Sequence, residues 1–239
     1  MIDYMELARC KINVLRDAGF NLTKDMKILD FGCGEGNLVN AFRELGYDAY
    51  GIDVIDCPNL DEIHYAKIGF NPYVIPFEDD FFDYVYSTSV FEHVMNTDES
   101  LKEIYRVLKH GGISTHSLPS RYRIIEPHIK VPFAGIIQCN AWLCFWAKMG
   151  IRNEFQKGLA WKEVYDRNHG YCREGINYMS YKEFKKRITA VFGNARIMTK
   201  EITRNSQGRA AALGRKLPIP GYEYMTFFFR EWNLLMKKC

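Results

Sequence analysis

The sequence predicts an α/β protein with a doubly wound, mostly parallel sheet of seven strands, of which the last is antiparallel. Three observations support this fold class. Short apolar strands alternate with helical segments over about 100 residues, a glycine-rich turn follows the first strand, and the sheet pattern returns at Ser180 after an irregular, aromatic-rich insertion. Such alternation produces βαβ units, whose crossovers cover a parallel sheet with helices on both faces.

Apolar periodicity places the elements in order. A leading amphipathic helix spans 3–18, and Gly19 is its stop signal. Strands are expected over 27–30, 48–54, 65–69, 82–87, 113–118, 195–203 and 231–237. Further helices are expected over 37–45, 97–109 and 181–192, the second of them ended by Gly111-Gly112.

Residues 119–179 interrupt this pattern and are predicted to be an insertion within a single domain, residues 1–239. The core then comprises 20–118 and 180–239, preceded by a leading helix within 1–19. Within the insertion, 131–147 carries no charged residue but is shorter than the roughly 20 apolar residues of a membrane span. No transmembrane segment is therefore predicted, and a lid, a dimer-contact helix and a membrane-surface element stay open for 131–147.

Composition favours a cytoplasmic protein. The seven cysteines are scattered without CxxC pairs, which indicates reduced thiols and no structural zinc. The first residues lack the apolar run of a signal peptide.

The net charge of +3 divides into −10 over 1–118 (10 basic, 20 acidic) and +13 over 119–239 (22 basic, 9 acidic). Two solvated faces, or a basic surface for an anionic partner, both explain this division.

The segment KILDFGCGEGNLV, residues 27–39, is the most informative stretch. Gly32, Gly34 and Gly36 form G-x-G-x-G, whereas a dinucleotide fingerprint places its third glycine where Asn37 stands. No lysine follows these glycines, so a P-loop is excluded. Asp30 is unsuited to a phosphate neighbour and suits a ligand with an ammonium group.

Asp53, at the end of the second strand, is an acid placed to bind a ribose diol. This position is common to several nucleoside ligands, so Asp53 indicates a nucleoside without choosing among them.

The D-x-G-x-G-x-G turn and two later stretches, YVIPFEDDFFDYVYSTSVFEHV and RVLKHGGISTHSLP, together resemble class I S-adenosylmethionine-dependent methyltransferases of the type 11-like group. The resemblance covers residues 25–118 well and the closing strand, 232–238, loosely. It implies a Rossmann-like fold and a transferase that uses S-adenosyl-L-methionine as methyl donor and releases S-adenosyl-L-homocysteine.

The resemblance also implies which residues bind this cofactor. Gly32, Gly34 and Gly36 would let the backbone approach its methionine and ribose part. Asp30 would orient the amino group, and the backbone carbonyl of Ser87 would accept a hydrogen bond from it.

The adenosine part would lie against the second strand and the segment after the third. Asp53 would hold the ribose hydroxyls and Val54 would pack on the adenine face. Asn71 stands where these enzymes usually place an acid at the adenine amino group, and an amide oxygen can accept that hydrogen bond.

Three histidines are candidates for the acceptor side, because methyl transfer to oxygen usually needs a base. His128, in a Glu-Pro-His segment that resembles family members with small or glycan-like acceptors, is the first choice. His93, in FEHV after the fourth strand, is the second, and His116 ends the fifth. For each, a hydrogen-bonded structural role stays open. No metal set is assigned, because Ser89 stands where a further acid would help.

The predicted function is methyl transfer to a small-molecule or glycan-like acceptor, at oxygen, with the insertion as an acceptor-side lid. An anionic acceptor and a homodimer stay open. The +13 half and the run 185–187 leave an RNA or protein methyltransferase as an alternative, although no RNA-binding signature is found. A non-catalytic S-adenosylmethionine-binding protein is the third hypothesis.

Overall fold

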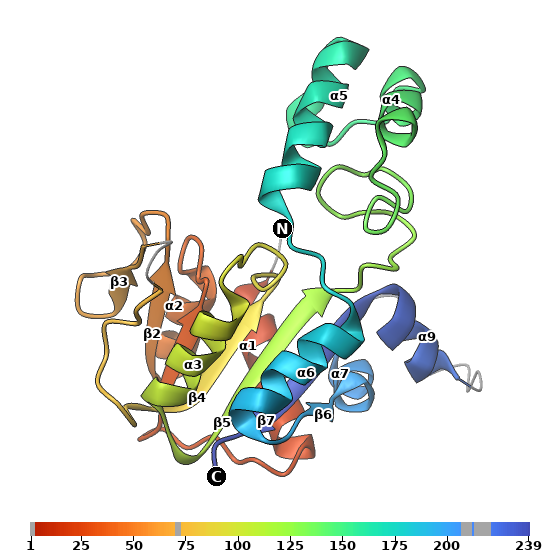
Figure 1. Cartoon of the computed structure of the whole chain (residues 1–239). Coiled ribbons are helices and arrows are strands. Elements are labelled where there is room, and N and C mark those ends of the chain that lie inside the picture. Colours follow the sequence, from red (N-terminus) through yellow and green to blue (C-terminus); the bar gives the residue numbers. More distant parts are fainter. Residues whose placement is uncertain (1–2, 70–72, 207–211, 213–220) are drawn as a thin grey trace.

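The structure is a computed structural model that describes residues 3–69, 73–206, 212 and 221–239. Its centre is a seven-stranded sheet in the order β3-β2-β1-β4-β5-β7-β6 (Figure 1). The strands are β1 (Lys27–Phe31), β2 (Asp48–Asp53), β3 (Tyr65–Lys67), β4 (Phe82–Thr88), β5 (Leu108–Pro119), β6 (Arg196–Ile197) and β7 (Glu231–Lys237). Strands β1 to β5 pair in parallel, and β7 pairs antiparallel with both β5 and β6. The predicted fold class is confirmed.

Helices cover both faces of the sheet, as Figure 1 shows. Side chains of α1 and α2 join one buried cluster, and side chains of α3 and α6 join the other. The helices are α1 (Tyr4–Asp17), α2 (Asn37–Glu44), α3 (Thr97–Val107), α4 (Asn140–Lys148), α5 (Trp161–Gly170), α6 (Tyr181–Phe192), α7 (Thr199–Asn205) and α9 (Tyr222–Phe229).

Local capping explains where the helices begin and end. The Asp3 carboxylate accepts a hydrogen bond from the Glu6 N–H at the start of α1, and Ser180 does the same for Glu183 at the start of α6. Gly193 ends α6 with a φ of 73°, a conformation that glycine adopts without the penalty of a Cβ.

The boundary between α3 and β5 differs from the prediction. The helix ends at Val107 and β5 begins at Leu108, so Gly111-Gly112 lies inside the strand and does not end the helix. Gly111 has a φ of 81°, and the β4–β5 register shifts between Phe82 and Tyr84. The two glycines therefore allow a bulge that the sequence pattern does not distinguish from a helix stop.

The predicted strand 195–203 is also wrong beyond its first residues. Only Arg196–Ile197 pair with β7, and α7 follows. The helix is held against α1, because the Asn205 side chain donates to Asp17 at 2.8 Å. Packing thus overrides a segment whose β-branched residues favour a strand.

The insertion lies between β5 and α6 and rises beyond the carboxyl ends of the strands (Figure 1). It contains α4, α5, a 3₁₀ turn (Glu154–Gln156) and a π turn (Tyr171–Gly175). A separate apolar cluster around Val131 and Leu143 holds it together. The uncharged stretch 131–147 forms a helix only from Asn140 onward. Among the described residues, no helix has the length and apolar character needed to cross a membrane.

Candidate active site

The glycine turn after β1 packs its backbone closely against neighbouring loops. Gly32 and Gly36 have φ values of 82° and 76°. A Cβ on Gly32 would lie 2.4 Å from the Val90 side chain, and one on Gly36 would lie 2.6 Å from Leu60. A Cβ on Gly34 would meet no described residue within 4 Å, so this part of the turn borders open space. The first and last glycines thus serve packing, and the middle one faces outward.

Asp53 fastens this turn to the end of β2. Its Oδ2 accepts a hydrogen bond from the Gly34 N–H at 2.7 Å, and its Oδ1 accepts one from the Val54 N–H at 2.7 Å. A carboxylate has about four acceptor positions. Oδ2, which accepts one hydrogen bond from the protein, keeps capacity for a ligand hydroxyl.

A cavity of about 270 Å³ opens at the carboxyl ends of β1, β2 and β4, where open α/β sheets bind their ligands. It brings together four of the predicted site residues, Gly32, Asp53, Val54 and His93. The other lining residues are Phe31, Ile68, Tyr73, Ser89, Val90 and Val94. We refer to it as the β-edge cavity. Asn71 lies outside the described residues.

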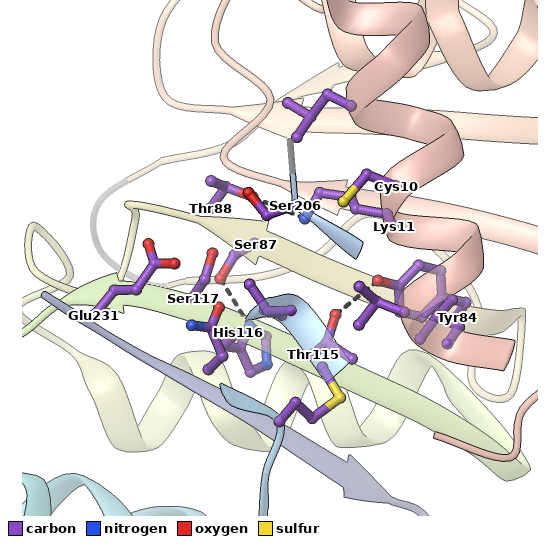
Figure 2. Close-up of a pocket in the computed structure, with 16 residues that line it drawn as sticks. Cys10, Lys11, Tyr84, Ser87, Thr88, Thr115, His116, Ser117, Ser206 and Glu231 are labelled. Carbon is purple, nitrogen blue, oxygen red and sulfur yellow. Dashed lines mark hydrogen bonds between the residues drawn. The ribbon is translucent and has the colours of Figure 1, made fainter. Parts of the chain in front are cut away.

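Ser87 and His116 line a different cavity, of about 180 Å³, between α1, α7 and the sheet (Figure 2). The Ser87 hydroxyl is 2.7 Å from His116 Nδ1, and the Ser114 hydroxyl is 2.9 Å from Nε2. Both ring nitrogens therefore have partners. Burial, with a contribution from the Lys11 charge, lowers the pKa of His116 to about 3, so the ring is neutral at physiological pH.

Asp30 lines neither cavity and is only 5% exposed. Burial raises its pKa to about 7, although the charge of Lys11 opposes the shift. Lys11 comes from α1, and its ammonium group donates to the Thr88 hydroxyl at 3.1 Å. Sequence reasoning missed this lysine. The available signal is its place on the inward face of α1, which it shares with Leu7 and Val14.

The other two candidate histidines lie together. The ring centroids of His93 and His128 are 4.9 Å apart, although one follows β4 and the other begins the insertion. His93 Nδ1 is 2.7 Å from the Gly175 carbonyl, and His128 Nδ1 is 2.6 Å from Glu126 Oε1. Because a carbonyl or carboxylate only accepts, each Nδ1 donates, and in the neutral form of each ring Nε2 carries the lone pair.

Glu126 orients His128. Besides the histidine, the carboxylate accepts from the Tyr178 hydroxyl at 2.8 Å and from the Ile129 N–H at 2.6 Å. Burial by itself raises the pKa of Glu126, but the hydrogen bonds from His128 and Ile129 outweigh it and lower the pKa. The carboxylate is therefore charged, and it holds the tautomer of His128 that leaves Nε2 free. The spacing Glu-Pro-His, two residues apart, is the sequence signal for this pair.

The His93–His128 pair lies between two cavities. His93 lines the β-edge cavity, and His128 lines a cavity of about 410 Å³ in the insertion, which we call the insertion cavity. Its other lining residues are Pro127, Ile129, Asn153, Glu154, Phe155, Gln156, Arg167, Asn168 and Tyr171. Two spaces that are each large enough for part of a ligand therefore meet at one pair of imidazoles.

Comparison with known proteins agrees with this architecture. A family model described as a methyltransferase domain matches residues 4–190. The chain is 32% identical over 103 residues to the sterol 4-C-methyltransferase strm-1 of Caenorhabditis elegans, covering 38% of this chain and 30% of that protein. It is 33% identical over 99 residues to the human mitochondrial ubiquinone biosynthesis O-methyltransferase, covering 36% and 27%. The matched region thus spans less than a third of either relative.

The fold is shared with solved structures. Phosphoethanolamine N-methyltransferase 2 of Haemonchus contortus, solved with phosphomonomethylethanolamine and S-adenosylhomocysteine, aligns with a TM-score of 0.52 at 16% identity over 96% of this chain and 52% of that one. The fold is thus that of a solved methyltransferase. Because the family model matches most of the chain, the protein belongs to the methyltransferase-domain family.

Proposed function

We propose that the β-edge cavity holds the adenosine part of S-adenosylmethionine. The Asp53 carboxylate has acceptor capacity for a ribose hydroxyl, and the apolar Val54 borders the same space. Gly34 leaves open space beside the turn, so a methionine tail meets no side chain there. Asp30 is 5% exposed and lies outside the cavity, so its role toward the amino group rests on the family resemblance.

We further propose that the acceptor is a small molecule that enters the insertion cavity and is methylated at oxygen. The observation that carries this proposal is the position of the His93–His128 pair on the border of both cavities. A donor in one cavity and an acceptor in the other would meet at this pair. The Nε2 atoms of His93 and His128 would lie beside the acceptor hydroxyl and accept its proton.

The insertion cavity has the chemistry to bind a polar acceptor. The Asn168 amide nitrogen is buried and has no hydrogen-bond partner among the described residues, although its oxygen accepts from Gln156 at 2.6 Å. A buried orphan donor favours a ligand that brings an oxygen acceptor. Arg167 also lines this cavity, but its guanidinium is paired with Glu163 at 2.9 Å and the acid Glu154 lines the same space, so the lining does not select an anionic acceptor.

The reaction needs alignment and removal of one proton. An acceptor oxygen attacks the methyl carbon in line, the O–C bond forms, the S–C bond breaks, and neutral S-adenosylhomocysteine leaves. Closing the site against water and orienting the two partners provide most of the acceleration. General base assistance to the hydroxyl contributes typically about 10²–10⁴-fold.

The charged surface of the described residues gives an RNA acceptor less support than a small molecule. In the basic run 185–187, Arg187 forms ion pairs with Asp98 at 2.7 Å and with Glu183 at 3.0 Å, so its charge is already compensated within the molecule. An RNA substrate would need uncompensated basic groups along a path.

A panel of hydroxylated small molecules, with and without carboxylate or phosphate groups, tests the proposal. We expect release of S-adenosylhomocysteine with a hydroxyl acceptor, and a mass-spectrometric product with the methyl on oxygen. His128→Gln should lower kcat/KM about 10²–10⁴-fold and leave S-adenosylhomocysteine affinity unchanged. His110→Gln, a change at an exposed histidine of β5, is the control. Methyl transfer to nitrogen or carbon, or only to RNA or protein, would contradict the proposal.

A further inference from the structure

Glu92, next to His93, has no role in the proposed reaction so far. It is 0% exposed, and neither carboxylate oxygen has a hydrogen-bond partner in the part of the chain that the structure describes. A buried carboxylate without a partner is costly, so it needs a compensating cation or donor that enters the site. Its neighbours are the two imidazoles of the His93–His128 pair: one ligand atom from each of the three residues lies within 4.8 Å of the others.

We propose that Glu92, His93 and His128 form a binding site for one divalent transition-metal ion. A carboxylate oxygen and two neutral imidazole nitrogens are a common donor set for Zn²⁺, and they also suit Fe²⁺ and Mn²⁺. With three protein ligands, the ion keeps open positions for a molecule that enters from either cavity.

The groups around the three ligands match those of a metal centre. A metal-bound histidine usually donates its other N–H to a carbonyl or carboxylate, which fixes the ring and its tautomer. His93 does so to the Gly175 carbonyl and His128 does so to Glu126. Both rings are thus held with Nε2 available for an ion.

Three separate chain segments build the site. Glu92 and His93 follow β4, Glu126 and His128 begin the insertion, and Gly175 ends the π turn that leads back to the sheet. A hydrogen bond from the Asn177 N–H to the Glu92 carbonyl fastens the last segment to the first. The site is therefore complete only when the insertion lies against the sheet edge, which explains why the sequence alone, with Ser89 in place of an acid, indicates no metal.

The proposed role of the ion deepens the proposed function and rests on it. An acceptor hydroxyl bound at an open position would lose its proton more readily, because the cation stabilises the alkoxide. The proton passes to solvent, the oxygen takes the methyl group, and the ion keeps its charge throughout, so no oxidant or reductant is required. The residues Glu92, His93 and His128 then act as ligands, and no imidazole needs to accept the proton.

Metal binding is measured directly on the full chain, without an acceptor. Protein dialysed against a chelator is titrated with Co²⁺, followed by absorbance, and with Zn²⁺, followed by calorimetry. We expect one equivalent to bind, with a Co²⁺ spectrum that lacks thiolate charge transfer, because the group of Glu92, His93 and His128 contains no cysteine. Glu92→Gln, which keeps the side-chain shape, and His128→Gln should each weaken binding at least about 10–100-fold, more than loss of an outer-shell partner. His110→Gln should bind as the wild type does.

A melting-temperature shift provides a second measurement that does not depend on enzymatic activity. Wild-type protein should be stabilised by added Zn²⁺, and Glu92→Gln should fold but show no such shift. The inference is overturned if the wild type binds no ion, or if both variants retain the wild-type affinity. If the ion binds and methyl transfer to oxygen is still absent, the metal site stands and the proposed function fails. If methyl transfer to oxygen proceeds at the full rate after the ion is removed, the proposed function stands and the proposed role of the ion in the reaction fails.

Discussion

At the scale of single residues, the site depends on side chains whose hydrogen-bonding capacity is already partly used. Asp53 holds the glycine turn and the start of the next loop, and Glu126 holds His128. Sequence motifs identify such residues by type and position. They do not show that His116, placed near the same sheet edge, has both nitrogens occupied by serines, whereas His93 and His128 each keep one free.

Replacing Asp53 by Ala should weaken S-adenosylhomocysteine binding by about 1–3 kcal/mol, the scale for lost hydrogen bonds to a charged group. The change also frees the Gly34 and Val54 N–H groups that the carboxylate accepts from. Isothermal titration calorimetry measures the loss. Asp56→Ala, at an exposed residue that forms an ion pair with Lys67, is the matched control and should bind normally. Unchanged affinity in Asp53→Ala would place the ribose elsewhere.

At the scale of elements, the strand–turn–helix units could be predicted because their apolar periods and stop signals are local. The predictions fail where contacts with distant parts of the chain determine whether a segment forms a strand or a helix and where it ends. The bulge in β5 makes room for Gly111 inside a strand, and α7 forms where a strand is expected because it packs on α1. The insertion is recognisable as an interruption of the pattern, but its π turn, and the hydrogen bond that the Gly175 carbonyl accepts from His93, depend on tertiary contacts.

The glycine turn offers a comparison between two positions with positive φ. Gly32→Ala places a Cβ 2.4 Å from Val90, whereas Gly34→Ala meets nothing. Both variants have the backbone penalty of about 1–2 kcal/mol for a left-handed residue. Gly32→Ala should cost about 1–3 kcal/mol more because of overpacking, as measured by urea unfolding. Val90→Ala in the Gly32→Ala background should recover part of that difference, and no recovery would contradict the steric explanation.

At the scale of the whole molecule, two buried groups of the central sheet, His116 and Asp30, give opposite pH dependence. Burial lowers the pKa of His116 to about 3 in the folded protein. Between pH 3 and 6.5 the unfolded chain therefore binds more protons than the folded chain, so stability falls as the pH decreases through this window. The pKa of Asp30 is raised to about 7 by burial, so the folded chain keeps a proton that the unfolded chain loses, and stability falls as the pH rises from 3.8 to 7.

His116→Gln should therefore remove the part of the free energy of unfolding that the wild type loses as the pH falls. Between pH 6 and 4, the wild type should lose about 1.4 kcal/mol per pH unit relative to the variant. Asp30→Asn should show the opposite difference over the same range. Urea unfolding at several pH values measures both slopes. Parallel curves for wild type and His116→Gln would mean that His116 titrates normally in the folded protein.

The sequence by itself determined the α/β fold, the glycine turn, the acid at the end of β2 and the family that these imply. These features are local, because a strand, a tight turn and a helix start are each specified by neighbouring residues. The tertiary structure alone decided which polar residues meet. Glu92, His93 and His128 come together because the insertion returns to the sheet edge, and Lys11 faces Thr88 because α1 packs on the sheet. Such meetings depend on how distant segments fold back on one another, which no local pattern records.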